Sequence, residues 1–400
     1  MTLSSVYPTR FKQDQQRAYD NLRQIRWLLK PAQQSSDPER DQRLLAHLMV
    51  CDPLSDEAYR EAGVPSLADL KEQITLAKTS RKASADHTPN QQQTLIEHVI
   101  NTPDWVDWDQ VERGAAVCRA TGLTGLRVLC DFSLLSGYQL SAINQTLLFT
   151  GNLASSVRHR LAQTTKWWYD CTRPHAMRPG NPGFNSTLQV RLIHSAVRDR
   201  IMQTNWNVTH LGLPINQTDM QVTYLSFSIV FLTGCRVLGC LINSEEAQAL
   251  MHLWRYIGWV MGVEESLLID TPSEGLEALY HNLLTQPMAD QSSVKLARAL
   301  LSPPKDTNRS WFESKQGQLQ SQIHRSILRF SGGKQLLDDL GLKPALPWFV
   351  LVAAPINAAF GLPFKAHPRT KTLEEWLGAR TQSTVIDLFR KSDLIGKNAG

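Results

Sequence analysis

The residues best suited to chemistry lie in one stretch, residues 190–201, which reads VRLIHSAVRDRI. At helical spacing its apolar side chains form one stripe, made up of Val190, Ile193, Val197 and Ile201. His194 lies within that stripe. A neutral imidazole in apolar surroundings can bind a metal ion, and it can equally be a hydrogen-bonded core residue. This helix alone leaves both interpretations open.

A second stripe runs beside the first one and consists of Arg191, Ser195 and Arg198. Arg191 lies one turn before the imidazole. An arginine forms strong, charge-assisted hydrogen bonds with carboxylates. The pair of stripes could therefore hold a metal centre next to an anionic group.

The preceding predicted helix, residues 152–170, also places a polar group on an apolar stripe. The stripe consists of Leu153, Val157, Leu161, Thr164 and Trp168. The Thr164 hydroxyl needs a partner, which is either the carbonyl four residues earlier or a group across the helix interface. Arg160 lies one turn before it, and Gln163 is its immediate neighbour.

The two helices are joined by a segment with three prolines and two glycines, residues 172–187, in which Asn185, Ser186 or Thr187 can cap the second helix. Such a connection makes the helices antiparallel neighbours, so that His194 and Thr164 could face a common gap. A planar apolar disc with charged edges, such as haem, would fit this gap. Arg191 or Arg198 would then meet an edge carboxylate.

Several stretches together resemble the rubber-oxygenase family, which includes the latex clearing proteins and the prenyl-chain oxygenase of mycophenolic acid synthesis. The matching residues are the segments 52–56 (DPLSD), 150–151 (TG), 160–164 (RLAQT), 191–198 (RLIHSAVR), 212–216 (GLPIN) and 252–258 (HLWRYIG). The resemblance is good over residues 95–265 and looser at both ends. It rests on the order and spacing of the stretches, because no single one of them is highly specific.

The resemblance implies a globin-like helical core around haem b, with His194 as the proximal iron ligand and Arg191 supporting the pocket. It puts Arg160 and Thr164 on the distal side. Latex-cleaving members carry a lysine immediately before the threonine, where this chain has Gln163. They also carry a glutamate that falls near Asn144 here.

The expected function is therefore that of a haem b-dependent oxygenase, which uses dioxygen on an apolar substrate such as an isoprenoid or another alkene. Arg160, Gln163 and Thr164 would hydrogen-bond the activated oxygen. Two alternatives stay open. One is a non-enzymatic haem protein, a sensor or carrier, and the other is a helical protein without a cofactor.

Composition narrows the remaining function classes. Hydrophobic residues make up 42% and charged residues 20% of the 400 residues, and the net charge of +5 is spread along the chain without a dense basic run. Nucleic-acid binding is therefore not expected. The six cysteines do not have the spacing of a zinc site, and we therefore expect them to be reduced, buried thiols. The first twelve residues lack the features of a secretion signal, which predicts a cytoplasmic location.

Helical spacing dominates the chain, and the predicted fold is all-α. We divide it into an N-terminal helical extension and linker (1–94), a haem-binding core (95–300) and a C-terminal helical extension (301–400). The apolar stretch 222–242 contains Arg236 and predicts a buried core helix. Prolines interrupt residues 346–364 and argue against one spanning helix. Peripheral membrane contact and the oligomeric state stay open.

Overall fold

The computed structural model describes residues 7–12, 37–80, 90–149, 153–301, 311–365 and 368–397. Within these ranges every regular element is a helix, which confirms the all-α prediction. In the first half of the chain these are η2 (Thr9–Lys12), α2 (Pro38–His47), α3 (Pro53–Ala62), α4 (Leu67–Ser80), α5 (Gln91–Ile100), α6 (Trp108–Ala120), α7 (Gly122–Val128), η5 (Leu129–Leu135), α8 (Ser141–Phe149), α9 (Leu153–Cys171) and α10 (Pro182–Met202). The second half contains α11 (Val208–Leu211), α12 (Gln217–Leu225), η6 (Ser226–Val230), α13 (Phe231–Val237), α14 (Ser244–Val260), η7 (Glu265–Leu267), α15 (Pro272–Leu284), α16 (Gln291–Leu301), α17 (Trp311–Asp339), α18 (Trp348–Lys365) and α19 (Pro368–Lys397).

Helix α14 lies in the centre of the molecule and packs along α6. It begins with a capping box, in which Asn243 and Glu246 bond each other's backbone N–H, and most of its residues are buried on all sides. The approach of α6 depends on Gly114, since a Cβ there would lie 2.3 Å from the carbonyl oxygen of Ala249. The two helices therefore meet backbone to backbone.

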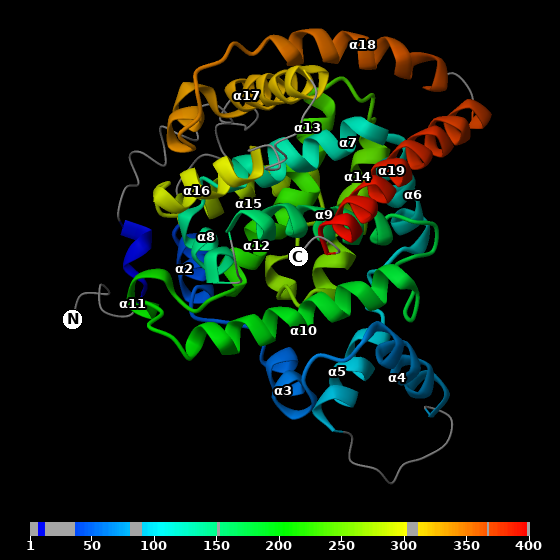
Figure 1. Ribbon diagram of the computed structural model, residues 1–400. Helices are drawn as coiled ribbons and strands as arrows, with labels where there is room; N and C mark the ends of the chain where they lie inside the picture. Colours follow the sequence, from blue (N-terminus) through cyan, green and yellow to red (C-terminus); the bar gives the residue numbers. More distant parts are fainter. Residues whose placement is uncertain are drawn as a thin grey trace.

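Helix α10 separates a small lobe of α3, α4 and α5 from the larger bundle (Figure 1). It is longer than expected and starts at Pro182 rather than after residues 185–187, with Asn181 at the N-cap position. Proline at the first helical position needs no N–H partner and is already set to a helical φ. Asn185, Ser186 and Thr187 lie inside the helix instead of capping it.

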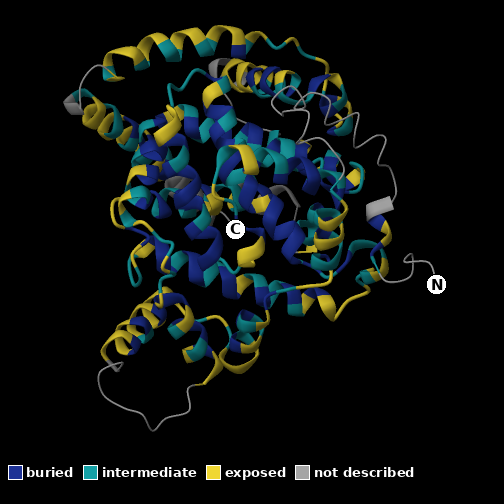
Figure 2. Ribbon diagram, turned by 180° about the vertical axis from the view of Figure 1, so that it is seen from behind, coloured by how far each residue is buried: buried dark blue, intermediate teal, exposed yellow. Residues whose placement is uncertain are grey.

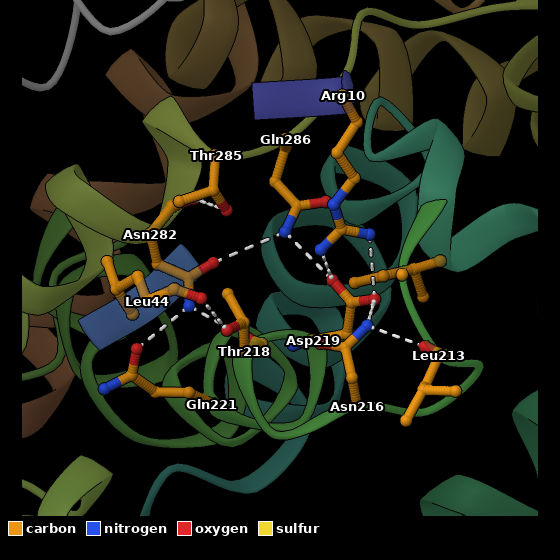
Figure 3. A network of polar contacts seen from close by, with 12 residues as sticks. Arg10, Leu44, Leu213, Asn216, Thr218, Asp219, Gln221, Asn282, Thr285 and Gln286 are labelled. Atoms are coloured by element: carbon orange, nitrogen blue, oxygen red, sulfur yellow. Dashed lines mark hydrogen bonds and ion pairs between the residues drawn. The ribbon is translucent and has the colours of Figure 1, made fainter. Parts of the chain in front are cut away.

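A buried polar network ties the N-terminal segment to the bundle (Figure 3). Arg10 is 1% exposed, and its guanidinium makes two hydrogen bonds to the Asp219 carboxylate, of 2.7 and 3.0 Å. Asn216 and Gln286 donate to the same carboxylate. Thr218 reaches the Leu44 carbonyl of α2 at 2.6 Å. Buried charges with this many partners hold distant segments in one arrangement.

Two helices, Gln217–Val237 and Trp348–Lys365, are long and apolar enough to cross a membrane by length and composition. The first is mostly buried and forms core, as predicted. The second corrects a prediction, because Pro355 and Pro363 lie inside one continuous helix rather than ending it. Only 6% of α18 is buried, so it lies on the surface of the bundle, as Figure 2 shows at its upper edge.

Candidate functional site

The buried face of α10 differs from the predicted stripe. Its members are Leu188, Arg191, Leu192, Ser195, Arg198 and Ile201. Of the predicted stripe only Ile201 is fully buried, whereas Ile193 is 41% exposed and both Val190 and Val197 are partly exposed. The arginines can be buried because carboxylates far away in the sequence neutralise them. The apolar stripe that contains His194 is therefore partly exposed among the described residues.

Two ion pairs hold α10 against α3. The Arg191 guanidinium donates from Nε to Asp52 Oδ2 over 2.7 Å and from Nη2 to Asp52 Oδ1 over 2.9 Å. Arg198 pairs with Asp56 and also donates to the Pro214 carbonyl. Arg191 or Arg198 was expected to meet a haem carboxylate, and the structure gives each of them a protein carboxylate as partner. Their position favours a role in fixing α10.

The imidazole of His194 is only partly satisfied by protein. Its Nδ1 is enclosed and has no hydrogen-bond partner among the described residues. No hydrogen bond to Nε2 is formed in that part of the chain either, and Nε2 is not among the enclosed atoms, so it keeps some accessible area. Burial, together with the charge of Arg198, lowers the pKa of His194 to about 4. At neutral pH the ring is uncharged and carries a free lone pair, as a metal ligand requires.

Across the hairpin, α9 presents two polar side chains that also lack partners. Gln163 and Thr164 are exposed and make no hydrogen bond to the described part of the protein. The bond to the carbonyl four residues earlier, expected as one option for Thr164, is made by its neighbour: Thr165 is buried and donates to Leu161 O over 2.7 Å. The Thr164 hydroxyl is consequently available to a ligand.

The contacts between the two helices fix their relative register. Trp167 Nε1 donates to Thr187 Oγ1 over 3.0 Å, and Cys171 Sγ lies 3.3 Å from the same oxygen. Thr164 precedes Cys171 by seven residues, and His194 follows Thr187 by seven. In antiparallel helices both side chains are therefore at the same level, about 10 Å from that contact along the hairpin.

The facing sides of α9 and α10 are thus in contact near the connecting loop. Gln163 and Thr164 lie one turn before Trp167 on the same face of α9. His194 lies two turns after Thr187 on α10. Gln163, Thr164 and His194 all keep accessible area, at about the same level of the hairpin. The start of α9, including the Leu153 side chain, lies outside the described side chains.

Arg160 and Asn144 are engaged with protein. Arg160 donates from Nη1 to the Leu147 carbonyl of α8 over 2.7 Å, and burial lowers the pKa of its guanidinium. Asn144 is fully buried and donates from Nδ2 to Tyr138 O and to Ser293 Oγ on α16. These bonds make Asn144 a link between helices.

Several of the stretches that carry the family resemblance meet at the buried side of α10. The sequence alone did not reveal that these stretches lie together. Asp52, the N-cap of α3, touches both Arg191 and the turn after α14. A Cβ at Gly262, where φ is +88°, would lie 2.3 Å from Asp52 Oδ2 and 2.6 Å from Arg191 Nε. Gln217 donates to the carbonyls of Cys51 and Gly262. These residues together fix the rotation of α10 and hence the direction of His194.

Comparison with known proteins shows the family to which this chain belongs. Residues 127–357, more than half of the chain, match the family described as ER-bound oxygenase mpaB/B'/Rubber oxygenase, catalytic domain. A rubber oxygenase of Streptomyces sp. (strain K30) is 25% identical over 222 residues, which are 54% of this chain and 53% of that protein. The chain thus spans about half the length of this curated relative.

A solved structure of latex clearing protein LCP in the closed state has a similar fold. The TM-score is 0.61 at 20% sequence identity, and the match covers 84% of this chain and 91% of the other. The residues matched by the family model, 127–357, include the helices that carry Thr164 and His194.

Proposed function

Because the chain belongs to the ER-bound oxygenase mpaB/B'/rubber oxygenase catalytic-domain family, we propose that it is a haem b-dependent oxygenase. Its substrate in this proposal is an apolar alkene such as an isoprenoid, and its oxidant is dioxygen. The observation that carries the proposal is the His194 imidazole, which is neutral and has an unpartnered Nδ1 and an open Nε2.

The residues around His194 fit a haem group. Ligation of iron through Nε2 would use the one ring nitrogen of His194 that keeps accessible area, and it would place the ring hydrogen on the enclosed Nδ1. Val190, Ile193 and Val197 surround the ring on α10 with apolar side chains that no protein covers fully. His194 would bind the iron, and these three side chains would contact the macrocycle. When bound, haem supplies the iron at which dioxygen is activated.

The chain's own polar groups have separate tasks in this proposal. Gln163 and Thr164 donate hydrogen bonds across the gap from His194. The Arg191–Asp52 pair keeps α10 from rotating, so that the imidazole stays directed at the gap. Arg160 holds the end of α8 through the Leu147 carbonyl and brings a positive charge to the distal side. Apolar surroundings exclude water and retain the substrate.

Proton removal by Asn144 has no place in this mechanism. An amide is not a base at neutral pH, and both hydrogens of its Nδ2 are directed at Tyr138 O and Ser293 Oγ. This observation favours a second candidate, in which the chain binds haem as a sensor or carrier without turnover. Consumption of dioxygen coupled to loss of an apolar substrate would exclude that candidate.

The test is the visible spectrum of the full chain, purified from cells supplied with haem precursor. We expect a Soret band that His194→Ala largely removes and that added imidazole partly restores. His175→Asn is the matched control, because His175 lies in the loop of the same hairpin, is exposed and has a φ of 58° that asparagine tolerates. A chain that stays colourless, or a His194→Ala variant that keeps its band, would contradict the proposal.

Turnover is then measured with the loaded protein. Oxygen uptake is followed with squalene as an isoprenoid probe, and the products are examined for new carbonyl groups. Uptake that depends on squalene supports the oxygenase. A stable haem spectrum without uptake supports the carrier or sensor.

A further inference from the structure

Helix α18 reverses the usual pattern of a surface helix, in which polar residues face the solvent. Residues 348–364 contain no charged residue, and the one strongly polar side chain, Asn357, points inward. Its Nδ2 donates to Leu238 O over 2.7 Å and lies 3.3 Å from Thr124 Oγ1. Apart from the indole N–H of Trp348, the outer face is left without a hydrogen-bonding side chain.

The outward side chains are large and apolar. They are between 37% and 73% exposed and comprise Trp348, Leu351, Val352, Ile356, Phe360 and Leu362. The row continues onto α19, because Phe360 and Leu377 line one cavity between the two helices. Leu373 and Trp376 add further exposed apolar area there. A continuous apolar surface of this length marks an interaction site rather than ordinary solvent-facing surface.

The exposed charged side chains of α18 and its adjoining turns, residues 340–380, share one sign. Among the described side chains from 340 to 380, the exposed charged ones are Lys343, Lys365, Lys371 and Arg380. The acidic groups nearby turn inward: Glu375 pairs with Arg119, and the carboxylate of Glu246 that two of the lysines contact is almost fully buried. The surface therefore combines apolar side chains with a basic rim.

We infer that α18, with the adjoining turns of α19, lies in the plane of a membrane whose surface carries anionic lipids. Apolar side chains would enter the boundary of the acyl chains, and the basic rim would meet lipid phosphates. Figure 1 shows α18 along the upper edge of the molecule, where a flat surface can reach it. A second copy of this chain would bring two basic rims together, which charge repulsion opposes.

The same observations exclude a helix that crosses the bilayer. The inner face of α18 is fixed to the bundle, since Phe349 N donates to Ser326 Oγ over 2.9 Å and Asn357 is bonded to the segment before α14. At Gly239, a Cβ would lie 2.1 Å from the Ala354 carbonyl oxygen. A helix in such close contact with the protein lies on a membrane and does not leave the bundle to span it.

Flotation of the full chain with lipid vesicles tests the inference and needs neither haem nor substrate. We expect binding to phosphatidylcholine vesicles that contain phosphatidylglycerol, and weaker binding to phosphatidylcholine alone or at high salt. The affinity of Leu351→Glu/Phe360→Glu for these vesicles should fall by roughly tenfold or more, because two apolar side chains that would enter the membrane are lost. Leu76→Glu, at a leucine of α4 that is 55% exposed, is the matched control and should bind like the unmodified chain.

The two mutated side chains are exposed, so the variants should keep the circular dichroism spectrum and melting temperature of the parent. Lys343→Glu/Arg380→Glu should reduce binding to the anionic vesicles only. The inference is overturned if the unmodified chain floats with neither kind of vesicle, or if Leu351→Glu/Phe360→Glu binds as well as the parent. It is also overturned if light scattering shows a dimer that this double variant converts to monomer, because the face would then belong to a second copy.

Discussion

The Arg191 guanidinium and the Asp52 carboxylate form a bidentate ion pair with almost no solvent access, and the side chains are 5% and 6% exposed. Asp52 begins α3, while Arg191 lies one turn before His194 on α10. The pair thus joins two segments that are 139 residues apart. It lies on the face of α10 next to the partly exposed stripe, because Arg191 and His194 are one turn apart, so it fixes the direction of the imidazole.

Removing one partner of this pair should strongly destabilise the protein. We expect Asp52→Asn to lower the free energy of unfolding by about 3–5 kcal/mol, because the Arg191 charge stays buried without a counter-charge. Urea denaturation measures the change. Glu57→Gln, an exposed carboxylate on the same helix, is the control and should change stability by no more than about 0.5 kcal/mol. Equal effects of the two substitutions would show that the pair is not structural.

The contact between α6 and α14 should tolerate no added carbon at Gly114. A Cβ there meets backbone atoms of Ala249 at 2.3 and 2.8 Å, and the backbone cannot rotate away as a side chain can. We expect Gly114→Ala to cost about 2–3 kcal/mol. Gly137→Ala is the control, since a Cβ at Gly137 meets nothing within 4 Å. A lower melting temperature for Gly114→Ala alone would agree with this packing.

Much of the helical hairpin could be predicted from local sequence. The apolar spacing indicated α9 nearly to the residue, and it placed Thr164 and His194 on neighbouring helices. The orientation of α10 could not be predicted, because it depends on Asp52 and Asp56, which bury Arg191 and Arg198 on the side that spacing alone makes polar. Hydrophobic periodicity counts an arginine as exposed and cannot anticipate a distant counter-charge.

Two other features of the fold, the π-helix at residues 129–135 and the continuous helix α18, could not be predicted from the sequence. Residues 129–135 form a π-helix, whose extra residue per turn breaks the helical spacing that would be read from the sequence. Prolines were expected to interrupt residues 346–364, yet Pro355 and Pro363 lie inside the continuous helix α18. Prolines remain tolerable within this helix because its carbonyls can be satisfied by water at the surface.

The stability of the protein without cofactor should depend on pH through His194. The pKa of this imidazole is about 4 in the folded chain, below its ordinary value of 6.5. As the pH falls, the unfolded state takes up the proton first, so stability is lost between pH 6.5 and 4 and not above that range. The loss from this group is at most about 3 kcal/mol.

Replacement of the imidazole by a side chain that does not titrate isolates this contribution. His194→Leu should lose less stability than the parent when the pH is lowered from 7 to 4. Burial also lowers the pKa of His98 and His252, so a smaller dependence should remain in the variant. Urea denaturation at several pH values gives both curves. Parallel curves would mean that the His194 ring is already protonated or solvated in the folded chain.

Thr164 and Thr165 should separate ligand binding from folding, although they are adjacent. Thr165→Val removes the hydrogen bond to Leu161 O and should cost about 1 kcal/mol of stability with little effect on a bound ligand. Thr164→Val removes a hydroxyl that bonds to no described residue and should leave the free energy of unfolding within about 0.5 kcal/mol. In the haem-loaded protein, however, it should reduce substrate-dependent oxygen uptake by roughly tenfold, which is the loss of one hydrogen bond at the reacting oxygen. Unchanged oxygen uptake in Thr164→Val would assign the distal hydrogen bond to Gln163 or Arg160 instead. Gln163→Leu then tests Gln163. This residue is the cleaner choice because Gln163, unlike Arg160, makes no hydrogen bond within the described part of the chain.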